Sequence, residues 1–309
     1  MKLSLVVPCY NEEGNVEKFF DVFTEAFNNK VEDYEFVFVD DGSKDDTRKK
    51  LRKLYHEKNE KKNIQVLSFS RNFGKEAAIY AGISKAEGDL LCLVDADLQQ
   101  RPEVVLEMLE VMASDDDIDC VTAYQEKRKE GKAISAVKHM FYEIINKVSD
   151  VEFVDGASDF RLMKRNVADA LLQMTEYHRF SKGMFSYVGF HTEYIPYTVA
   201  ERESGESKWG VKKLIKYALE GIFAFSVAPL KIATLIGVVF ALLALCGLVV
   251  SLFLGNAFAI STLIAVSAVF FVGGVVLVCL GVIGEYLSKM YVQGKNRPVY
   301  ILKEHLHED

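Results

Sequence analysis

The chain has 309 residues, of which 50% are hydrophobic and 26% are charged, and it contains only five prolines. This composition supplies enough apolar material for a buried core, and it excludes disordered, collagen-like and disulfide-scaffold proteins. The formal net charge of −7 argues against a general nucleic-acid-binding protein, which needs a basic surface to displace phosphate counterions. We therefore expect no nucleic acid as a partner.

Residues 1–125 alternate short apolar segments with helical patterns. We expect strands at 3–8, 34–40, 63–69, 89–95 and 117–123, and helices near 12–29, 45–59, 73–86 and 102–114. Continuous apolar strands separated by helices predict an α/β fold with a mostly parallel sheet that is covered on both faces. Ligands of such sheets bind beyond the carboxyl ends of the strands.

Acidic residues follow three of these predicted strands. The first strand runs into residues 8–13 (PCYNEE), the second into residues 40–43 (DDGS), and the fourth into residues 95–99 (DADLQ). One acidic loop after a strand is usually a solvated turn or a helix N-cap, and Glu13 fits a charge at a helix N-terminus. Three such loops at neighbouring strand ends instead predict a shared binding site.

This predicted site lacks the usual glycine-rich phosphate loops. The first strand is not followed by G-x-G-x-x-G, and G-x-x-x-x-G-K-[ST] does not occur in the sequence. Asp95, Asp97 and Gln99 instead offer hard oxygen donors at a spacing of two residues. Such donors suit Mg²⁺ or Mn²⁺ that also binds the phosphates of a substrate.

Two helical patterns after residue 125 are amphipathic. Residues 135–148 carry apolar side chains at 137, 140, 141, 144, 145 and 148, and residues 211–225 place lysines beside an apolar stripe. Each helix either lies in a membrane interface with its basic residues toward lipid phosphate or packs on the domain core.

A long uncharged segment follows. No Asp, Glu, Lys or Arg occurs from Ile232 to Gly284, and Gly255–Asn256 interrupts this segment near its middle. About 20 apolar residues cross a bilayer, so we expect two transmembrane helices, at about 232–254 and 259–284. Lysine and arginine flank the pair on both outer sides, which predicts cytoplasmic termini and a cytoplasmic large domain at the plasma membrane. The Gly273–Gly274 pair allows close helix contact and is consistent with a homo-oligomer.

The amino-terminal segment and the cysteines agree with a cytoplasmic large domain. The apolar stretch at the amino terminus is too short for a secretory signal and runs straight into two glutamates. The five cysteines form no C-x-x-C motif, and three of them, Cys9, Cys92 and Cys120, fall in apolar segments that look like strands. They are interpreted as buried thiols in a reducing compartment.

Five segments in order carry a family resemblance: VVPCYNEE, VDDGSKDDT, SRNFGKEAAI, GDLLCLVDADLQ and DFRLMKR. Together they resemble family 2 glycosyltransferases with a GT-A fold, a Rossmann-like, mostly parallel sheet. The nearest branch is the one that transfers sugar to polyprenyl phosphate, the bactoprenol glycosyltransferases, which are related to dolichol-phosphate mannose synthase. The resemblance covers nearly the whole chain, including the two-helix segment.

The resemblance implies a role for particular residues. The nucleotide sugar is expected at the first two strand ends, with the metal after the fourth strand and with two basic residues closing over the diphosphate. The donor-binding residues are then Pro8, Tyr10, Glu12, Asp40, Asp41, Asp95, Arg202 and Lys208, and the metal ligands are Asp95, Asp97 and Gln99. Arg128 is expected to bind the acceptor phosphate. Asp159 is the expected catalytic acid, with Asp155 as an alternative.

Asp159 lies in an apolar, strand-like segment, where a charge is costly unless it has a partner or a task. An attacking hydroxyl would need this carboxylate as a general base. A phosphate monoester has a second pKa near 6 and is already largely ionised at neutral pH. We therefore expect Asp159 to orient the acceptor or hold its residual proton more than to activate it.

The sequence thus predicts four parts. Residues 1–210 form a cytoplasmic GT-A domain, 211–228 an interface helix, 229–288 the two spans, and 289–309 a cytoplasmic tail whose His305 and His307 do not resemble a metal site. The predicted reaction is inverting transfer of one sugar, from UDP-glucose or UDP-N-acetylglucosamine, to undecaprenyl or related polyprenyl phosphate for cell-envelope glycosylation. The alternatives are a processive polysaccharide synthase, which the missing Q-x-x-R-W motif disfavours, and a non-catalytic membrane scaffold that retains the fold.

Overall fold

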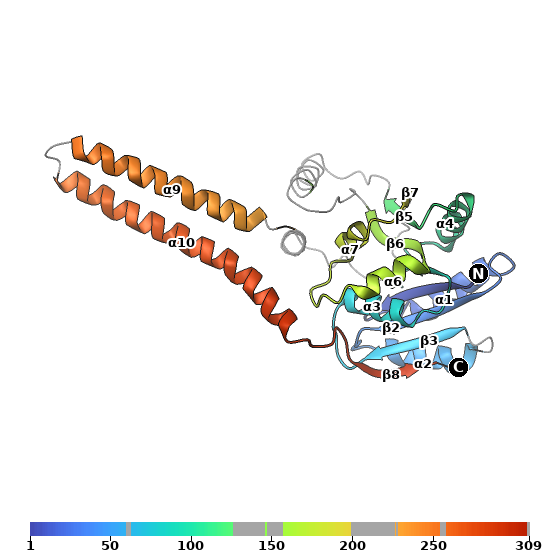
Figure 1. Ribbon diagram of the computed structural model, residues 1–309. Helices are drawn as coiled ribbons and strands as arrows, with labels where there is room; N and C mark the ends of the chain where they lie inside the picture. Colours follow the sequence, from blue (N-terminus) through green and yellow to red (C-terminus); the bar gives the residue numbers. More distant parts are fainter. Residues whose placement is uncertain are drawn as a thin grey trace.

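The structure is a computed structural model that describes residues 1–59, 63–125, 146, 157–198, 226, 228–253 and 258–307. Its centre is an eight-stranded sheet in the order β7-β5-β6-β4-β1-β2-β3-β8 (Figure 1). The strands are β1 Leu3–Cys9, β2 Tyr34–Asp40, β3 Ile64–Phe69, β4 Leu90–Leu93, β5 Cys120–Gln125, β6 Ala157–Lys164, β7 Thr192–Tyr197 and β8 Leu302–Leu306.

The four central strands, β4, β1, β2 and β3, are parallel, as the sequence predicts. The predicted fifth strand also forms, but it does not pair with β4. The antiparallel strand β6 lies between β4 and β5, and β5 then pairs in parallel with β7. Because β6 returns beside β4, the residues of β6 reach the same part of the molecule as the loop after β4.

Helices cover both faces of the sheet. They are α1 Val16–Phe27, α2 Thr47–Lys58, α3 Lys75–Lys85, α4 Pro102–Ser114, α6 Arg165–Gln173 and α7 Ser181–Tyr187. Successive residues of a strand point to opposite faces, so Leu5 and Val7 pack in the cluster with α1, α2 and α4, whereas Val6 packs in the cluster with α3, α6 and α7. The four helices expected from the first 125 residues are all present.

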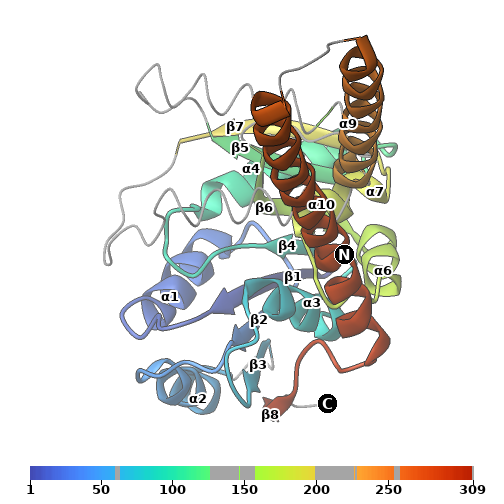
Figure 2. The same ribbon diagram turned by 90° about the vertical axis from the view of Figure 1, so that its left-hand side faces the viewer.

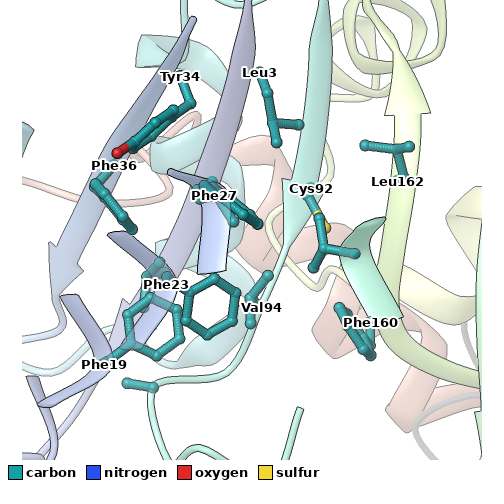
Figure 3. Close-up of a cluster of buried hydrophobic side chains, with 14 of the residues drawn as sticks. Leu3, Phe19, Phe23, Phe27, Tyr34, Phe36, Cys92, Val94, Phe160 and Leu162 are labelled. Atoms are coloured by element: carbon teal, nitrogen blue, oxygen red, sulfur yellow. The ribbon is translucent and has the colours of Figure 1, made fainter. Parts of the chain in front are cut away.

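The first of these clusters is rich in aromatic rings (Figure 3). Phe19, Phe23 and Phe27 recur every four residues on α1, so they share one face of the helix. The rings of Phe19 and Phe23 stack with their centroids 4.2 Å apart, and Phe36 of β2 lies edge-on to Phe19. Each buried ring contributes about 1.5–3 kcal/mol of apolar transfer free energy, which fixes α1 against the sheet.

Two long apolar helices, α9 Ala228–Phe253 and α10 Phe258–Gly294, run side by side and extend away from the α/β domain (Figure 1). The rings of Phe240 and Phe271 meet between them with centroids 4.8 Å apart. Within the described residues, Ala268–Gly294 of α10 is long and apolar enough to cross a membrane, and Ala228–Phe240 is a shorter apolar part of α9. Both predicted spans are therefore helical, and their insertion in a membrane stays a prediction.

The chain returns from α10 to the sheet. The Gln293 side chain accepts a hydrogen bond from the Tyr177 N–H at 2.8 Å and donates one to the Thr175 carbonyl at 3.3 Å. Strand β8 then pairs antiparallel with β3 at the edge of the sheet (Figure 2). Arg52 of α2 donates two hydrogen bonds of 2.7 Å to Glu304. Residues 302–306, expected within a polar tail, are thus part of the central sheet.

Candidate active site

The site lies where β4, β1 and β2 end, because neighbouring parallel strands bring their carboxyl ends to one edge of the sheet. The loops after β1 and β2 are joined by hydrogen bonds. The Asp41 N–H donates to the Cys9 carbonyl at 2.9 Å, and the Asn11 N–H donates to Ser43 Oγ at 3.0 Å. Two of the three acidic loops predicted from the sequence therefore form one connected surface.

The residues predicted to hold the nucleotide at the end of β1 lie on this surface. Pro8 and Tyr10 are half-buried, and Pro8 pairs with Val39 in the register of the sheet. Glu12 Oε2 accepts a hydrogen bond from the Asn15 side chain at 2.7 Å. Glu13 accepts one from the Asp46 N–H at 2.9 Å, so its charge lies at the N-terminus of α2.

Asp40 is fully buried at the end of β2. Its Oδ1 accepts a hydrogen bond from the Ser43 N–H at 2.9 Å, and its Oδ2 is paired with the Arg48 guanidinium at 2.9 Å. Arg48 also donates to the Phe69 carbonyl at 3.0 Å. In this structure Asp40 therefore ties β2 to α2 and, through Arg48, to β3. Its contact with a nucleotide stays a prediction.

The neighbouring Asp41 holds a different loop, residues 72–74, by hydrogen bonds. It accepts hydrogen bonds from the Phe73 N–H at 2.6 Å, the Gly74 N–H at 2.9 Å and the Asn72 side chain at 2.8 Å. Burial raises the pKa of Asp41 to about 6, although the two backbone donors favour its ionised form. The residues that Asp41 holds lead directly into α3.

The contact between Asp41 and residues 72–74 requires a glycine at the next position, Gly42. Gly42 has a φ of +63°, and a Cβ atom at this position would lie 2.3 Å from the Arg71 carbonyl carbon. The backbones after β2 and β3 thus approach so closely that a side chain cannot fit between them. Asp41 and Gly42, which follow the end of β2, therefore also position the start of α3.

The first residue of α3, Lys75, connects two acids of the site. Its Nζ lies 2.7 Å from Asp95 Oδ1, after β4, and 3.2 Å from Asp159 Oδ2, on β6. Burial alone would lower the pKa of Lys75, but the negative charges of Asp95 and Asp159 raise it above its ordinary value. Lys75 is a site residue that the sequence analysis missed, although its segment, SRNFGKEAAI, belongs to the family resemblance.

Asp159, the predicted catalytic acid, lies beside this lysine. Burial alone would raise the pKa of Asp159, but the charges of Lys75, Lys182 and Arg161 outweigh burial and hold the pKa below its ordinary value. Its Oδ1 is buried and, among the residues that the structure describes, has no hydrogen-bond partner. Asp159 thus has one oxygen held by Lys75 and one oxygen that no described residue contacts by a hydrogen bond, in surroundings whose positive charges favour its ionised form.

The arginine and lysine near Asp159 come from β6 and α7. The Arg161 guanidinium stacks over the Phe185 ring, and its central carbon, Cζ, lies 3.6 Å from the ring centroid. Lys182 follows Ser181, whose N–H donates to Glu76 Oε2 at 3.0 Å. Burial lowers the pKa of Lys182, while the charge of Asp159 opposes that shift. These contacts join α7 to the start of α3 around the acid.

The turn after β4 presents the predicted metal ligands. Leu98 has a φ of +60°, and the Gln99 N–H donates to Asp97 Oδ1 at 3.2 Å. The buried Gln100, which the sequence analysis also missed, accepts from the Asp95 N–H at 2.8 Å and donates to Asp95 Oδ2 at 3.3 Å. Asp95 is therefore held by Gln100 on one oxygen and by Lys75 on the other.

This turn fits a hard divalent cation by its chemistry. Carboxylate and amide oxygens are the donors that Mg²⁺ and Mn²⁺ prefer, and the Lys75 ammonium shows that positive charge is accommodated at Asp95 Oδ1. In the part of the chain that the structure describes, no three His, Cys, Asp or Glu side chains gather to hold a metal. The predicted set has only two carboxylates, so a cation there needs further oxygen donors, such as those of a diphosphate.

Several predicted features lie outside the described residues. They are Arg128, Asp155, Arg202, Lys208, most of the helix expected at 135–148, and the helix expected at 211–225.

Comparisons with known proteins decide the family. Residues 4–172 match the model of the family described as "Glycosyl transferase family 2". The chain belongs to glycosyl transferase family 2. The match covers β1 through most of α6 and includes Asp40, Asp95 and Asp159. Together with the observed sheet, membership of glycosyl transferase family 2 confirms the expected α/β GT-A fold and the assignment as a glycosyltransferase.

Relatives in this glycosyl transferase family extend the similarity to the helices. The chain is 36% identical over 305 residues to a putative glycosyltransferase, CsbB, of Bacillus subtilis, covering 98% of this chain and 91% of that protein. It is 36% identical to a prophage bactoprenol glucosyl transferase homolog of Escherichia coli, covering 98% and 99%. It is 37% identical to the bactoprenol glucosyl transferase of Shigella phage SfII, covering 98% of both. Among solved structures, glucosyl-3-phosphoglycerate synthase from Mycobacterium tuberculosis has a TM-score of 0.49 at 16% identity, covering 72% of this chain and 76% of that one.

Proposed function

We propose that this glycosyltransferase transfers one sugar, glucose or N-acetylglucosamine, from a uridine diphosphate sugar to undecaprenyl or a related polyprenyl phosphate, with inversion. The observation that carries the proposal is the pair of acids, Asp95 and Asp159, held by one lysine at the edge of the sheet in a chain that also has long apolar helices. The names of the Shigella phage and Escherichia coli relatives support a polyprenyl acceptor and favour glucose.

In this reaction the anomeric carbon of the sugar loses its bond to the diphosphate oxygen and gains a bond to an oxygen of the acceptor phosphate. The departing nucleoside diphosphate keeps the electron pair. When bound at Asp95, Asp97 and Gln99, a divalent cation would supply positive charge for the diphosphate. The charges of Lys75, Lys182 and Arg161 favour the ionised form of Asp159 before the acceptor binds, so its carboxylate either orients the acceptor or takes the residual proton of a monoprotonated phosphate.

The membrane arrangement belongs to the same proposal. The exposed apolar surface of α9 and α10 suits lipid, and such a large apolar area is otherwise rare on a protein in water. The excess of Lys and Arg on both outer sides of the helices supports a cytoplasmic catalytic domain at the plasma membrane. The acceptor phosphate would then meet the donor at the cytoplasmic face.

The experiment is transfer of radiolabel from a panel of UDP- and GDP-sugars to undecaprenyl phosphate by the full chain in detergent, with Mg²⁺, Mn²⁺ or a chelator. We expect a chloroform-soluble product from one donor, lost with the chelator. Labelled polymer in the aqueous phase would overturn the proposal in favour of a synthase. Nucleotide binding without transfer from any donor would favour a scaffold.

Asp159→Asn tests the role of the acid in the same assay. Because a phosphate acceptor is already largely ionised, the variant is expected to keep a measurable residual rate with unchanged donor binding. Asp169→Asn, on the neighbouring helix α6, is the matched control. Complete loss of transfer in Asp159→Asn with intact donor binding would show that the acid is needed as a general base.

A further inference from the structure

The ion pairs of Lys75 raise a question about the proposed metal site. The ammonium lies 2.7 Å from Asp95 Oδ1, which is also a predicted ligand of the divalent cation. The same ammonium lies 3.2 Å from Asp159 Oδ2. The Lys75 ammonium thus lies between Asp95, which is predicted to serve the donor, and Asp159, which is predicted to serve the acceptor.

The position of Lys75 is fixed by the fold. The Asp41 carboxylate holds the N–H groups of Phe73 and Gly74, and Gly74, with a φ of +102°, turns the chain into α3. Farther along this helix, a Cβ atom at Gly82 would lie 2.3 Å from Val6 Cγ1, so α3 packs directly on β1. The backbone that carries Lys75 therefore has little freedom to move away from the site.

The ion pair is nevertheless open to ligands. The side chain of Lys75 is 44% exposed and that of Asp95 is 35% exposed, whereas that of Asp159 is only 21% exposed. A divalent cation or a diphosphate arriving from solvent can thus reach the contact between Lys75 and Asp95 more easily than Asp159. The more exposed ion pair, between Lys75 and Asp95, is also the contact that the proposed divalent cation must displace.

We infer that Lys75 is a positioning residue that competes with the divalent cation for Asp95, so that cation binding transfers the ammonium to Asp159. This inference rests on the proposed metal site at Asp95. A lysine and a divalent cation on neighbouring oxygens repel each other, and the negative charge of a diphosphate offsets this repulsion. The cation alone therefore binds weakly, and it binds well together with the nucleotide.

This competition makes the contacts of Lys75 depend on whether the donor and its cation are bound. With neither ligand bound, Lys75 divides its hydrogen bonds between the two acids. Once the donor and its cation occupy Asp95, the ammonium is held by Asp159 alone. Asp159 then has the ammonium to itself only when a donor is present, whereas it shares the ammonium with Asp95 in the empty site.

The test measures binding of Mn²⁺ alone to the full chain in detergent, from the loss of the electron paramagnetic resonance signal of free Mn²⁺. Lys75→Met removes the charge and keeps the length of the side chain. Even at the dielectric constant of water, about 80, removing a unit charge about 5 Å from a divalent cation is expected to tighten its binding at least about tenfold. Lys75→Arg keeps the charge and is expected to bind Mn²⁺ within about twofold of the original chain.

Two further variants make the result specific. Lys85→Met makes the same substitution in the last turn of α3, where the lysine is exposed, and it is expected to leave Mn²⁺ binding unchanged. Lys75→Gln is a second neutral variant whose amide can still donate to Asp159, and it should also tighten Mn²⁺ binding. A structural role of Lys75 alone would weaken binding in both neutral variants or leave it unchanged.

The outcomes separate this inference from the proposed function. Unchanged or weaker Mn²⁺ binding in both neutral variants would overturn the competition while leaving the metal site in place. If the original chain and Lys75→Met both fail to bind Mn²⁺ even with UDP or GDP, the metal site itself is overturned, and the inference with it. Tighter binding in the neutral variants together with slower sugar transfer is the expected result.

Discussion

The close packing of α3 on the sheet predicts that Gly82→Ala destabilises the protein, although alanine is the better helix former. A Cβ atom at Gly82 would lie 2.3 Å from Val6 Cγ1 and 3.3 Å from Val39 Cγ2. Overpacking of this kind costs about 1–3 kcal/mol, and the helix propensity of alanine returns about 1 kcal/mol. Because the 2.3 Å overlap is severe and Val6 is fully buried, the cost lies in the upper half of that range. The expected net loss is then about 1–2 kcal/mol, which lowers the Tm by about 2–8 °C for a domain of this size.

The buried cysteines provide the assay. Cys9, Cys92 and Cys120 are free and at most 2% exposed, and burial raises the pKa of each thiol, so a thiol-reactive fluorogenic dye reaches them only on unfolding. Cys246 and Cys279 lie in the apolar helices and are replaced by alanine in all variants. The Tm is then read from dye fluorescence on heating the full chain in detergent.

Val6→Ala provides the decisive comparison, because it removes the atom that the new methyl group would meet. In the Val6→Ala background, Gly82→Ala should cost little or become slightly stabilising, since the propensity gain is then opposed only by the 3.3 Å approach to Val39 Cγ2. An equal loss of Tm in both backgrounds, or no loss in either, would refute the proposed contact between α3 and β1. A displaced α3 should also slow sugar transfer, because Lys75 lies at the start of this helix.

Three other substitutions test the remaining contacts. Arg48→Met leaves the fully buried Asp40 without its ion-pair partner and is expected to cost about 3 kcal/mol by the same melting assay, whereas Arg48→Lys should cost less. Arg52→Met removes the exposed pair with Glu304, so we expect only a small fall in Tm that shrinks further in high salt; a large, salt-independent fall would contradict a surface pair. For Glu35, burial alone would raise the pKa, but hydrogen bonds from Ser4 and the Glu87 N–H and the charge of Lys2 lower it below 4.5. Its stabilisation is therefore present above pH 4.5 and lost as the pH falls through the lowered pKa, so the Tm advantage over Glu35→Gln should shrink in acid, and a constant difference would contradict the shift.

The sequence predicted the central sheet well because its strands are continuous apolar segments. Such segments need burial on both faces, and helices between them leave a parallel arrangement as the natural solution. The strand LKEHL at 302–306 has no such signal, since three consecutive polar residues lie between its two leucines. Its pairing depends on β3, which is far away in the sequence, so no local pattern could have indicated it.

The site was predicted in part for a similar reason. The acids of the strand ends were recognisable from their positions alone, whereas Lys75 looks like an ordinary residue in the first turn of a helix. Its importance arises from Asp95 and Asp159, which lie on two different strands and meet it only in the folded chain. Asp41 was assigned to the nucleotide pocket, and nothing in the sequence indicated that it holds the backbone before α3.

The return of the chain to β3 through β8 also has a consequence for biosynthesis. The edge strand β3 is made early, but its partner β8 is translated only after both apolar helices. At about 5–20 residues per second, β3 presents unpaired backbone groups for some tens of seconds during translation. Because open strand edges recruit other strands, newly made chains are most exposed to mispairing during this interval, and completion of the sheet must wait until the apolar helices have left the ribosome.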